Sequence, residues 1–222
     1  MAQGWLRKSS SVRLAASWHH EHPSFVRPHS PNPVPSHRSE LVAIVRASPW
    51  FMEALQAVAS LRLEAWCIGA GAVRNLVWDH LHGRTEPSAL ADVDVAYFDQ
   101  ADLNPSREKV LQSALQSVAP DLPWEVTNQA AVHLWFESYF GHKVEPLHSL
   151  EEAVASWPEY ATSVGVTLDA QQEVRILAPW GLEDLFGIVV RRNPTRVSVE
   201  TYRQRIEQKR YSERWPKVKV FA

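Results

Sequence analysis

The chain has little cysteine, little glycine and little net charge, and it contains no long hydrophobic run. Its 222 residues include 1 Cys and 8 Gly. A single cysteine excludes an intrachain disulfide and a zinc site of several cysteines, and it indicates a reducing compartment, most simply the cytoplasm. No run of about 18 apolar residues is present, so the sequence predicts no membrane span. Lys and Arg total 23 against 25 Asp and Glu, a net charge of −2, without the basic excess of proteins that coat nucleic acid.

Residues 1–40 differ in composition from the rest of the chain. They hold five Pro, eight Ser and five His, with five basic and two acidic side chains, and they show no apolar periodicity. This composition predicts a disordered or extended basic tail; an organellar transit peptide and a start codon assigned too far upstream are the alternatives. Residues 41–222 carry 18 basic and 23 acidic side chains, a net charge of −5, which argues against a nucleic-acid partner.

Apolar periodicity predicts an alternation of helices and short strands. The expected helices are residues 49–63, 73–81, 105–118, 150–157, 181–190 and 199–215, and the expected strands are residues 65–68, 90–98, 123–126 and 173–177. This order predicts an α/β (α+β) fold, in which a small mixed sheet is flanked by helices. We expect a core over residues 41–145 and a mostly helical extension, packed on that core, over residues 146–222.

Two acids on one predicted strand are the sharpest chemical feature. Asp92 and Asp94 are two residues apart, so on a strand both carboxylates point to the same face. Two bare carboxylates this close repel each other, and a divalent cation such as Mg²⁺, which prefers oxygen ligands, relieves the repulsion. However, acids that alternate along the solvent-facing side of a strand give the same pattern. The pair alone is therefore compatible with two interpretations, a metal site and a solvated strand face.

Small residues and two further charged side chains surround this pair in the sequence. Gly69, Ala70 and Gly71 follow a predicted strand and open a predicted helix. Such residues let backbone N–H groups approach a phosphate at the positive end of a helix, or they simply form a tight turn. Arg74 in the next turn either reaches a triphosphate or pairs with an acid on the sheet. Glu125, on the following strand, is either solvent-facing or a third metal ligand and base.

The order of these parts resembles the DNA polymerase β-type nucleotidyltransferase superfamily and, more narrowly, a bacterial nucleotidyltransferase-like family. The matching stretches, between about residues 41 and 220, are WCIGAGAVRNLVWDHLHG, DVDVAYFD, WEVTNQAAVHLWF, SLEEAVASWPEYATSVGVTL, APWGLEDLFGIVVR and YRQRIEQKRYSERWPKV. The turn is also similar to the Gly-Gly-x-Val-Arg-Asp turn of CCA-adding enzymes, although Asn75 replaces the Asp. We expect no room in this chain for tRNA-holding helical domains.

The resemblance implies transfer of an NMP from an NTP to an unidentified hydroxyl on a small molecule or a protein, with Mg²⁺ or Mn²⁺ as cofactor and release of pyrophosphate. It assigns metal binding and catalysis to Asp92, Asp94 and Glu125, and phosphate binding to the turn from Gly69 to Gly71 and to Arg74. A catalytically silent nucleotide-binding regulatory module with the same fold is the alternative. A tRNA-type nucleotidyltransferase is a second, weaker alternative.

Three polar residues beyond Glu125 are weaker candidates for substrate contacts. Asn128 and Gln129 could equally cap a turn, and a hydrogen-bonded core residue is the simpler interpretation of His133. The last predicted helix is basic but contains interspersed Glu residues, a pattern that favours a solvated face over a nucleic-acid stripe and leaves a polyanionic ligand open. Its basic residues are Arg203, Arg205, Lys209, Arg210 and Arg214.

Overall fold

A five-stranded mixed sheet forms the centre of the computed structural model, which describes residues 36–221. The strands are β1 (Trp66–Gly69), β2 (Val93–Tyr97), β3 (Trp124–Asn128), β4 (Gly165–Leu168) and β5 (Val174–Leu177). Their order across the sheet is β3-β2-β1-β4-β5. Strands β2 and β3 are parallel, and the other neighbouring pairs are antiparallel. Most of the tail expected over residues 1–40 lies outside the described residues, but residues 37–40 belong to the first helix.

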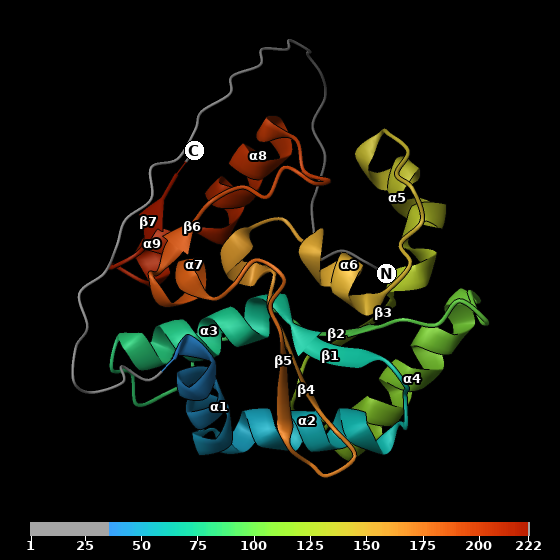
Figure 1. Cartoon of the computed structure of the whole chain (residues 1–222), viewed down its shortest axis with the longest axis horizontal. Coiled ribbons are helices and arrows are strands. Elements are labelled where there is room, and N and C mark those ends of the chain that lie inside the picture. The colour runs from blue at the N-terminus through green and yellow to red at the C-terminus, as the bar shows by residue number, and fades with distance from the viewer. Residues whose placement is uncertain (1–35, 222) are drawn as a thin grey trace.

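Helices lie on both sides of this sheet (Figure 1). The longer ones are α1 (His37–Ala47), α2 (Pro49–Ser60), α3 (Ala70–Leu81), α4 (Pro105–Val118), α5 (Val132–Phe140) and α8 (Val199–Lys209). The shorter ones are α6 (Leu150–Ala155), α7 (Glu183–Phe186), α9 (Tyr211–Arg214) and the 3₁₀ turns η1 (Gln129–Ala131) and η2 (Tyr160–Thr162). Within residues 36–221 no single helix is long and apolar enough to cross a membrane; only α1 and α2 taken together are, and they meet at a bend of 91°.

Strand β2 separates the two faces of the sheet. Val93, Val95 and Tyr97 are buried in the main core, together with side chains of α1, α2 and α4, as the alternation of the sequence predicted. Ala96 lies on the opposite face, in a smaller cluster with α6 and Trp157. Because side chains alternate along a strand, Asp94 shares this second face with Ala96. The acids therefore lie on the α6 side of the sheet, away from the main core.

The predicted fold class, a small mixed sheet flanked by helices, is confirmed. Two predicted helix starts are also confirmed. The Asn104 side chain accepts a hydrogen bond from the Ser106 N–H, and the Ser149 hydroxyl accepts one from the Glu152 N–H. The helix that follows β1 is terminated by Gly83, whose φ of +65° lies in the left-handed region that favours glycine.

The second half of the chain contains more strand than its sequence pattern indicated. Strands β4 and β5 join the same sheet as β1 to β3, and β4 was not predicted. The helix predicted over residues 181–190 is wrong beyond α7, because residues 189–190 form β6 and pair in parallel with β7 (Lys219–Val220). A two-residue strand whose partner lies about 30 residues further along the chain produces no periodic pattern in its own sequence. The helix predicted over residues 199–215 is interrupted at Arg210, where φ is +47°.

Candidate active site

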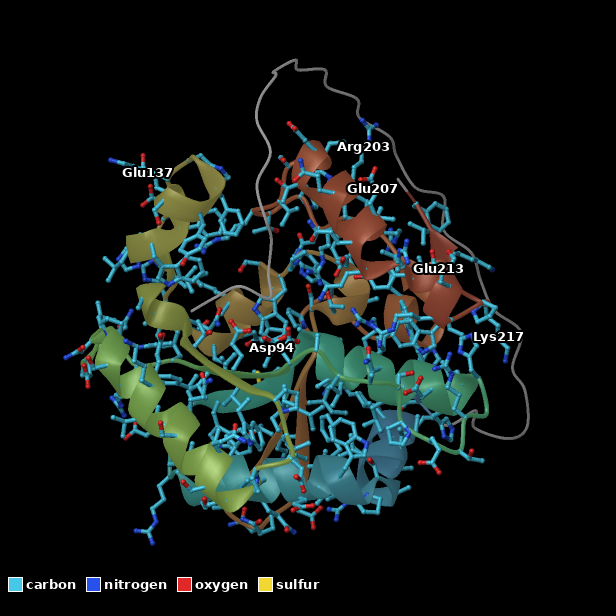
Figure 2. All side chains as sticks on the ribbon, turned by 180° about the vertical axis from the view of Figure 1, so that it is seen from behind. Asp94, Glu137, Arg203, Glu207, Glu213 and Lys217 are labelled. Atoms are coloured by element: carbon cyan, nitrogen blue, oxygen red, sulfur yellow. The ribbon has the colours of Figure 1, made fainter. Side chains whose placement is uncertain are left out.

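Three carboxylates converge where β2 and β3 run side by side. Asp94 and Glu125 are partners in the parallel register, and Asp92 directly precedes β2. One oxygen from each of the three side chains lies within 4.8 Å of the others. In Figure 2 the labelled Asp94 lies below and between two helices, α8 with Arg203 and Glu207 on one side and α5 with Glu137 on the other. The structure thus brings the three predicted acids into one small volume.

The electrostatics of this cluster favour a bound cation. Burial, with the nearby Asp92 and Glu125 carboxylates, raises the pKa of Asp94 to about 8. Burial, with Asp92, raises the pKa of Glu125 to about 7. The Glu125 Oε1 atom is buried and has no hydrogen-bond partner among residues 36–221. Three oxygen ligands that destabilise one another when ionised, one of them unpartnered, fit a hard divalent cation.

The turn from Gly69 to Gly71 lies beside the acids. A Cβ on Gly69 would fall 2.4 Å from ring carbons of Trp157, so this position requires glycine. Ala70 begins α3 with φ +49°, and its N–H donates to the Val164 carbonyl at 3.2 Å. A Cβ on Gly71 would lie 3.7 Å from Asp92 Oδ1, with no closer neighbour. The open approach to the turn is therefore at Gly71, because the Ala70 amide is already used within the protein.

Arg74 is held in a cage of aromatic rings. Its guanidinium carbon lies 5.7 Å, 5.1 Å and 5.3 Å from the ring centroids of Trp78, Tyr211 and Trp215. The Nη2 atom donates to Asn75 Oδ1 at 2.8 Å and lies 3.7 Å from where a Gly71 Cβ would be. The cage stabilises the cation without neutralising it, since a ring face attracts a charge but does not cancel it. A fixed positive charge therefore borders the turn.

A second cation, which the sequence pattern did not single out, comes from α8. Burial and the neighbouring Arg205 lower the pKa of Lys209, while Asp92 and Asp94 act in the opposite direction. Lys209 is therefore close enough to these two acids to interact with them electrostatically. None of the hydrogen bonds or ion pairs found among residues 36–221 involves its ammonium group. A half-buried ammonium in this position is suited to an anion.

Arg205 differs from Lys209 because its charge is already paired. Its Nε lies 2.5 Å from Oε1 of the fully buried Glu159, which also accepts a 2.9 Å hydrogen bond from the Tyr211 hydroxyl. Tyr211 in turn is one wall of the Arg74 cage. Glu159 thereby fixes α8 and α9 against the turn. The spacing of Arg205 and Lys209, four residues apart and so on one helix face, is the signal that could have marked them.

A family model described as Nucleotidyltransferase matches residues 56–220, which is most of the chain and includes every residue of this site. The chain belongs to this nucleotidyltransferase family. None of the curated proteins matches it at a significant level.

Solved structures with the same fold include CCA-adding enzymes. A protein whose NMR structure is described as revealing a CCA-adding enzyme head domain has 27% identity and a TM-score of 0.70, over 82% of this nucleotidyltransferase and 94% of that chain. A CCA-adding enzyme in complex with CTP has 12% identity and a TM-score of 0.51, over 83% of this chain and 43% of that one. The Thermotoga maritima CCA-adding enzyme bound to tRNA has 13% identity and a TM-score of 0.49, over 83% and 42%. The nucleotidyltransferase thus spans less than half the length of these last two enzymes.

The three weaker candidates occupy different environments in the nucleotidyltransferase. Asn128 is buried, and its amide bonds to the backbone of Asp99, Asp102 and Ala130, so its hydrogen-bonding groups serve the turns after β2 and β3. Gln129 is also buried and lines a cavity next to the sheet. His133 is half-buried, and its Nδ1 has no hydrogen-bond partner among the described residues.

Proposed function

We propose that this nucleotidyltransferase transfers an NMP from an NTP to a hydroxyl group on a small molecule, in a reaction that depends on Mg²⁺ or Mn²⁺. The observation that carries the proposal is the placement of opposite charges. Three converging carboxylates lie on the sheet, and two cations without a carboxylate partner, Arg74 and Lys209, border them. A metal ion would neutralise the carboxylates, and a triphosphate would neutralise Arg74 and Lys209. The two together would therefore complete this arrangement.

Asp92, Asp94 and Glu125 would hold the metal. The raised pKa values of Asp94 and Glu125, and the unpartnered Glu125 oxygen, support this assignment. When bound, a divalent cation supplies charge neutralisation at the phosphate oxygens during displacement. Arg74, Lys209 and the Gly71 end of the turn would hold the β- and γ-phosphates; the Ala70 amide contributes less than the sequence suggested, because it donates to Val164.

The reaction itself needs little covalent chemistry from the protein. The acceptor oxygen forms a bond to the α-phosphorus, the bond from that phosphorus to the β-bridging oxygen breaks, and pyrophosphate leaves. The acceptor proton passes to a carboxylate at the site, and Glu125, which lies beside Asp94 on the neighbouring strand, is the assigned base. Alignment of acceptor and leaving group, and electrostatic stabilisation, supply most of the rate.

A thermal-shift screen of the four NTPs, each with and without Mg²⁺ or Mn²⁺, tests the nucleotide site. We expect metal-dependent stabilisation by at least one NTP and its loss in Asp92→Ala. No shift with any NTP would refute the proposal. Mixing the stabilising NTP, labelled at the α-phosphate, with a panel of hydroxyl compounds and a tRNA lacking its CCA end then separates three outcomes. Label on a small molecule supports the proposal, label on the tRNA favours a CCA-adding activity, and binding without any transfer favours the silent nucleotide-binding module.

A further inference from the structure

The direction from which an acceptor arrives follows from the placement of the cations, if the proposed function holds. In an in-line displacement the attacking oxygen lies opposite the leaving pyrophosphate across the α-phosphorus. Arg74 and Lys209, which would hold that pyrophosphate, belong to α3 and α8. Figure 2 places Asp94 between α8 on one side and α5 on the other. The acceptor must therefore approach from the side of β3 and α5.

A cavity lined mainly by aromatic and other apolar side chains lies on that side. Its lining includes Thr127, Gln129, Phe136, Phe140, Trp157 and Arg196. Thr127 lies on the same face of β3 as Glu125, two residues further along, a separation of roughly 6–7 Å. The backbone position that carries the Glu125 carboxylate is therefore separated from the cavity lining by about the length of one six-membered ring. The cavity volume is about 40 Å³, so the edge of one ring enters it, the rest of a ligand lies outside it, and a nucleoside is not admitted.

Two polar groups that line the cavity are available to a ligand. Gln129 is 8% exposed as a whole residue, and its side-chain amide makes no hydrogen bond to any residue in the range 36–221. Its amide atoms are not among the fully buried atoms that lack a partner, so the amide opens onto accessible space in the cavity that it lines. A ligand atom in the cavity can therefore pair with it.

The second group is Arg196. Its guanidinium lies 5.8 Å from the ring centroid of Phe136 and donates to the Glu145 carbonyl at 2.6 Å. Burial lowers its pKa, and Glu152 opposes this from beyond ion-pair distance. Among the described residues no carboxylate lies within 4 Å of it. A half-buried guanidinium without a counter-ion favours a carboxylate or a phosphate on the ligand.

We propose that this cavity binds the acceptor, and that the acceptor is a small hydroxyl-bearing molecule with a flat apolar ring and an anionic group. The edge of the ring enters the cavity against Phe136 and Trp157, the anionic group meets Arg196, and the hydroxyl points along β3 toward Glu125. Charge complementarity at Arg196, the free amide of Gln129 and continuity with the strand that carries Glu125 all favour this occupant over a nucleobase.

The test measures binding of two probes to the full chain with Mg²⁺ by ligand-observed NMR. The first is 4-(hydroxymethyl)benzoate, and the second is benzyl alcohol, which lacks the anion. We expect Arg196→Gln to weaken benzoate binding about tenfold and to leave benzyl alcohol unchanged. Phe136→Ala should weaken both. The matched controls, Leu134→Ala on the exposed face of α5 and Arg203→Gln on the exposed face of α8, should change neither.

NTP binding, measured on the same variants, separates this inference from the proposed function and checks that each variant folds. Unchanged NTP binding with weakened probe binding supports the cavity as the acceptor site. Absence of probe binding to the wild type, or equal binding to all variants, overturns it. Loss of NTP binding in folded Phe136→Ala also overturns it and assigns the cavity to the nucleobase. If the probes bind as expected while no NTP binds the wild type, the proposed function fails, and the acceptor role of the cavity fails with it.

Discussion

Asp94 and Glu125 face each other as register partners on the two parallel strands of an otherwise antiparallel sheet. Their carboxylates therefore leave the same face at the same level, and Asp92 joins them from the start of β2. The two side chains cannot leave this shared position on the sheet without breaking the register. The repulsion among them is consequently built into the sheet, and it can be measured as a dependence of stability on pH.

Asp94→Asn should abolish NMP transfer and stabilise the metal-free protein. The pKa of Asp94 is raised to about 8, so in the absence of metal the folded state loses stability as pH rises from about 4 to about 8. The variant lacks this penalty. Its melting temperature in EDTA should exceed that of the wild type by several degrees at pH 8 and by much less at pH 5. Retained NMP transfer would contradict the role assigned to Asp94, and so would a difference in melting temperature that does not increase with pH.

Lys209→Met should weaken NTP binding roughly 10- to 100-fold, because one charge-assisted contact to a phosphate is lost. Metal binding without nucleotide should persist. Arg203→Met on the exposed face of the same helix is the matched control and should bind NTP normally. Calorimetric titration of both variants with the stabilising NTP measures the difference. Equal affinities in the two variants would remove Lys209 from the phosphate site.

Glu159→Gln should destabilise the fold by roughly 3–5 kcal/mol, because it leaves the Arg205 charge buried without its partner. Burial alone would raise the pKa of Glu159, but the Arg205 guanidinium, together with the Thr162 hydrogen bond and the Arg74 charge, outweighs it and the pKa falls. Urea unfolding measures the loss. The double variant Glu159→Gln, Arg205→Met should recover part of the stability, since it removes both charges. A double variant no more stable than the single one would argue against this ion pair as the cause.

Gly69→Ala and Gly71→Ala should differ although they lie in the same turn. A methyl group at Gly69 would overlap the Trp157 ring, at a cost of about 1–3 kcal/mol, whereas at Gly71 it meets nothing closer than 3.7 Å. Thermal unfolding of the two metal-free variants compares them directly. Similar melting temperatures would show that Trp157 moves aside.

The sequence predicted those parts of the site whose residues lie close together along the chain. Alternation placed Asp92 and Asp94 on one face, and the small residues from 69 to 71 marked the turn before α3. Glu125 was found because strand β3 has a clear pattern. Lys209 was not singled out, because it reaches the site only when α8 packs near a turn that lies more than a hundred residues earlier in the chain. Strands β4 and β6 were missed for a related reason, since their partners, rather than their own composition, make them strands.

The aromatic cage around Arg74 has a consequence for the order in which the site is completed during synthesis. All three acids belong to the first 125 residues, whereas Lys209, Tyr211 and Trp215 emerge much later. A growing chain therefore contains the three acids of the proposed metal site well before it contains the cation and the aromatic rings of the proposed phosphate site. A chain cut short before α8 would keep these acids and lose that part of the phosphate site.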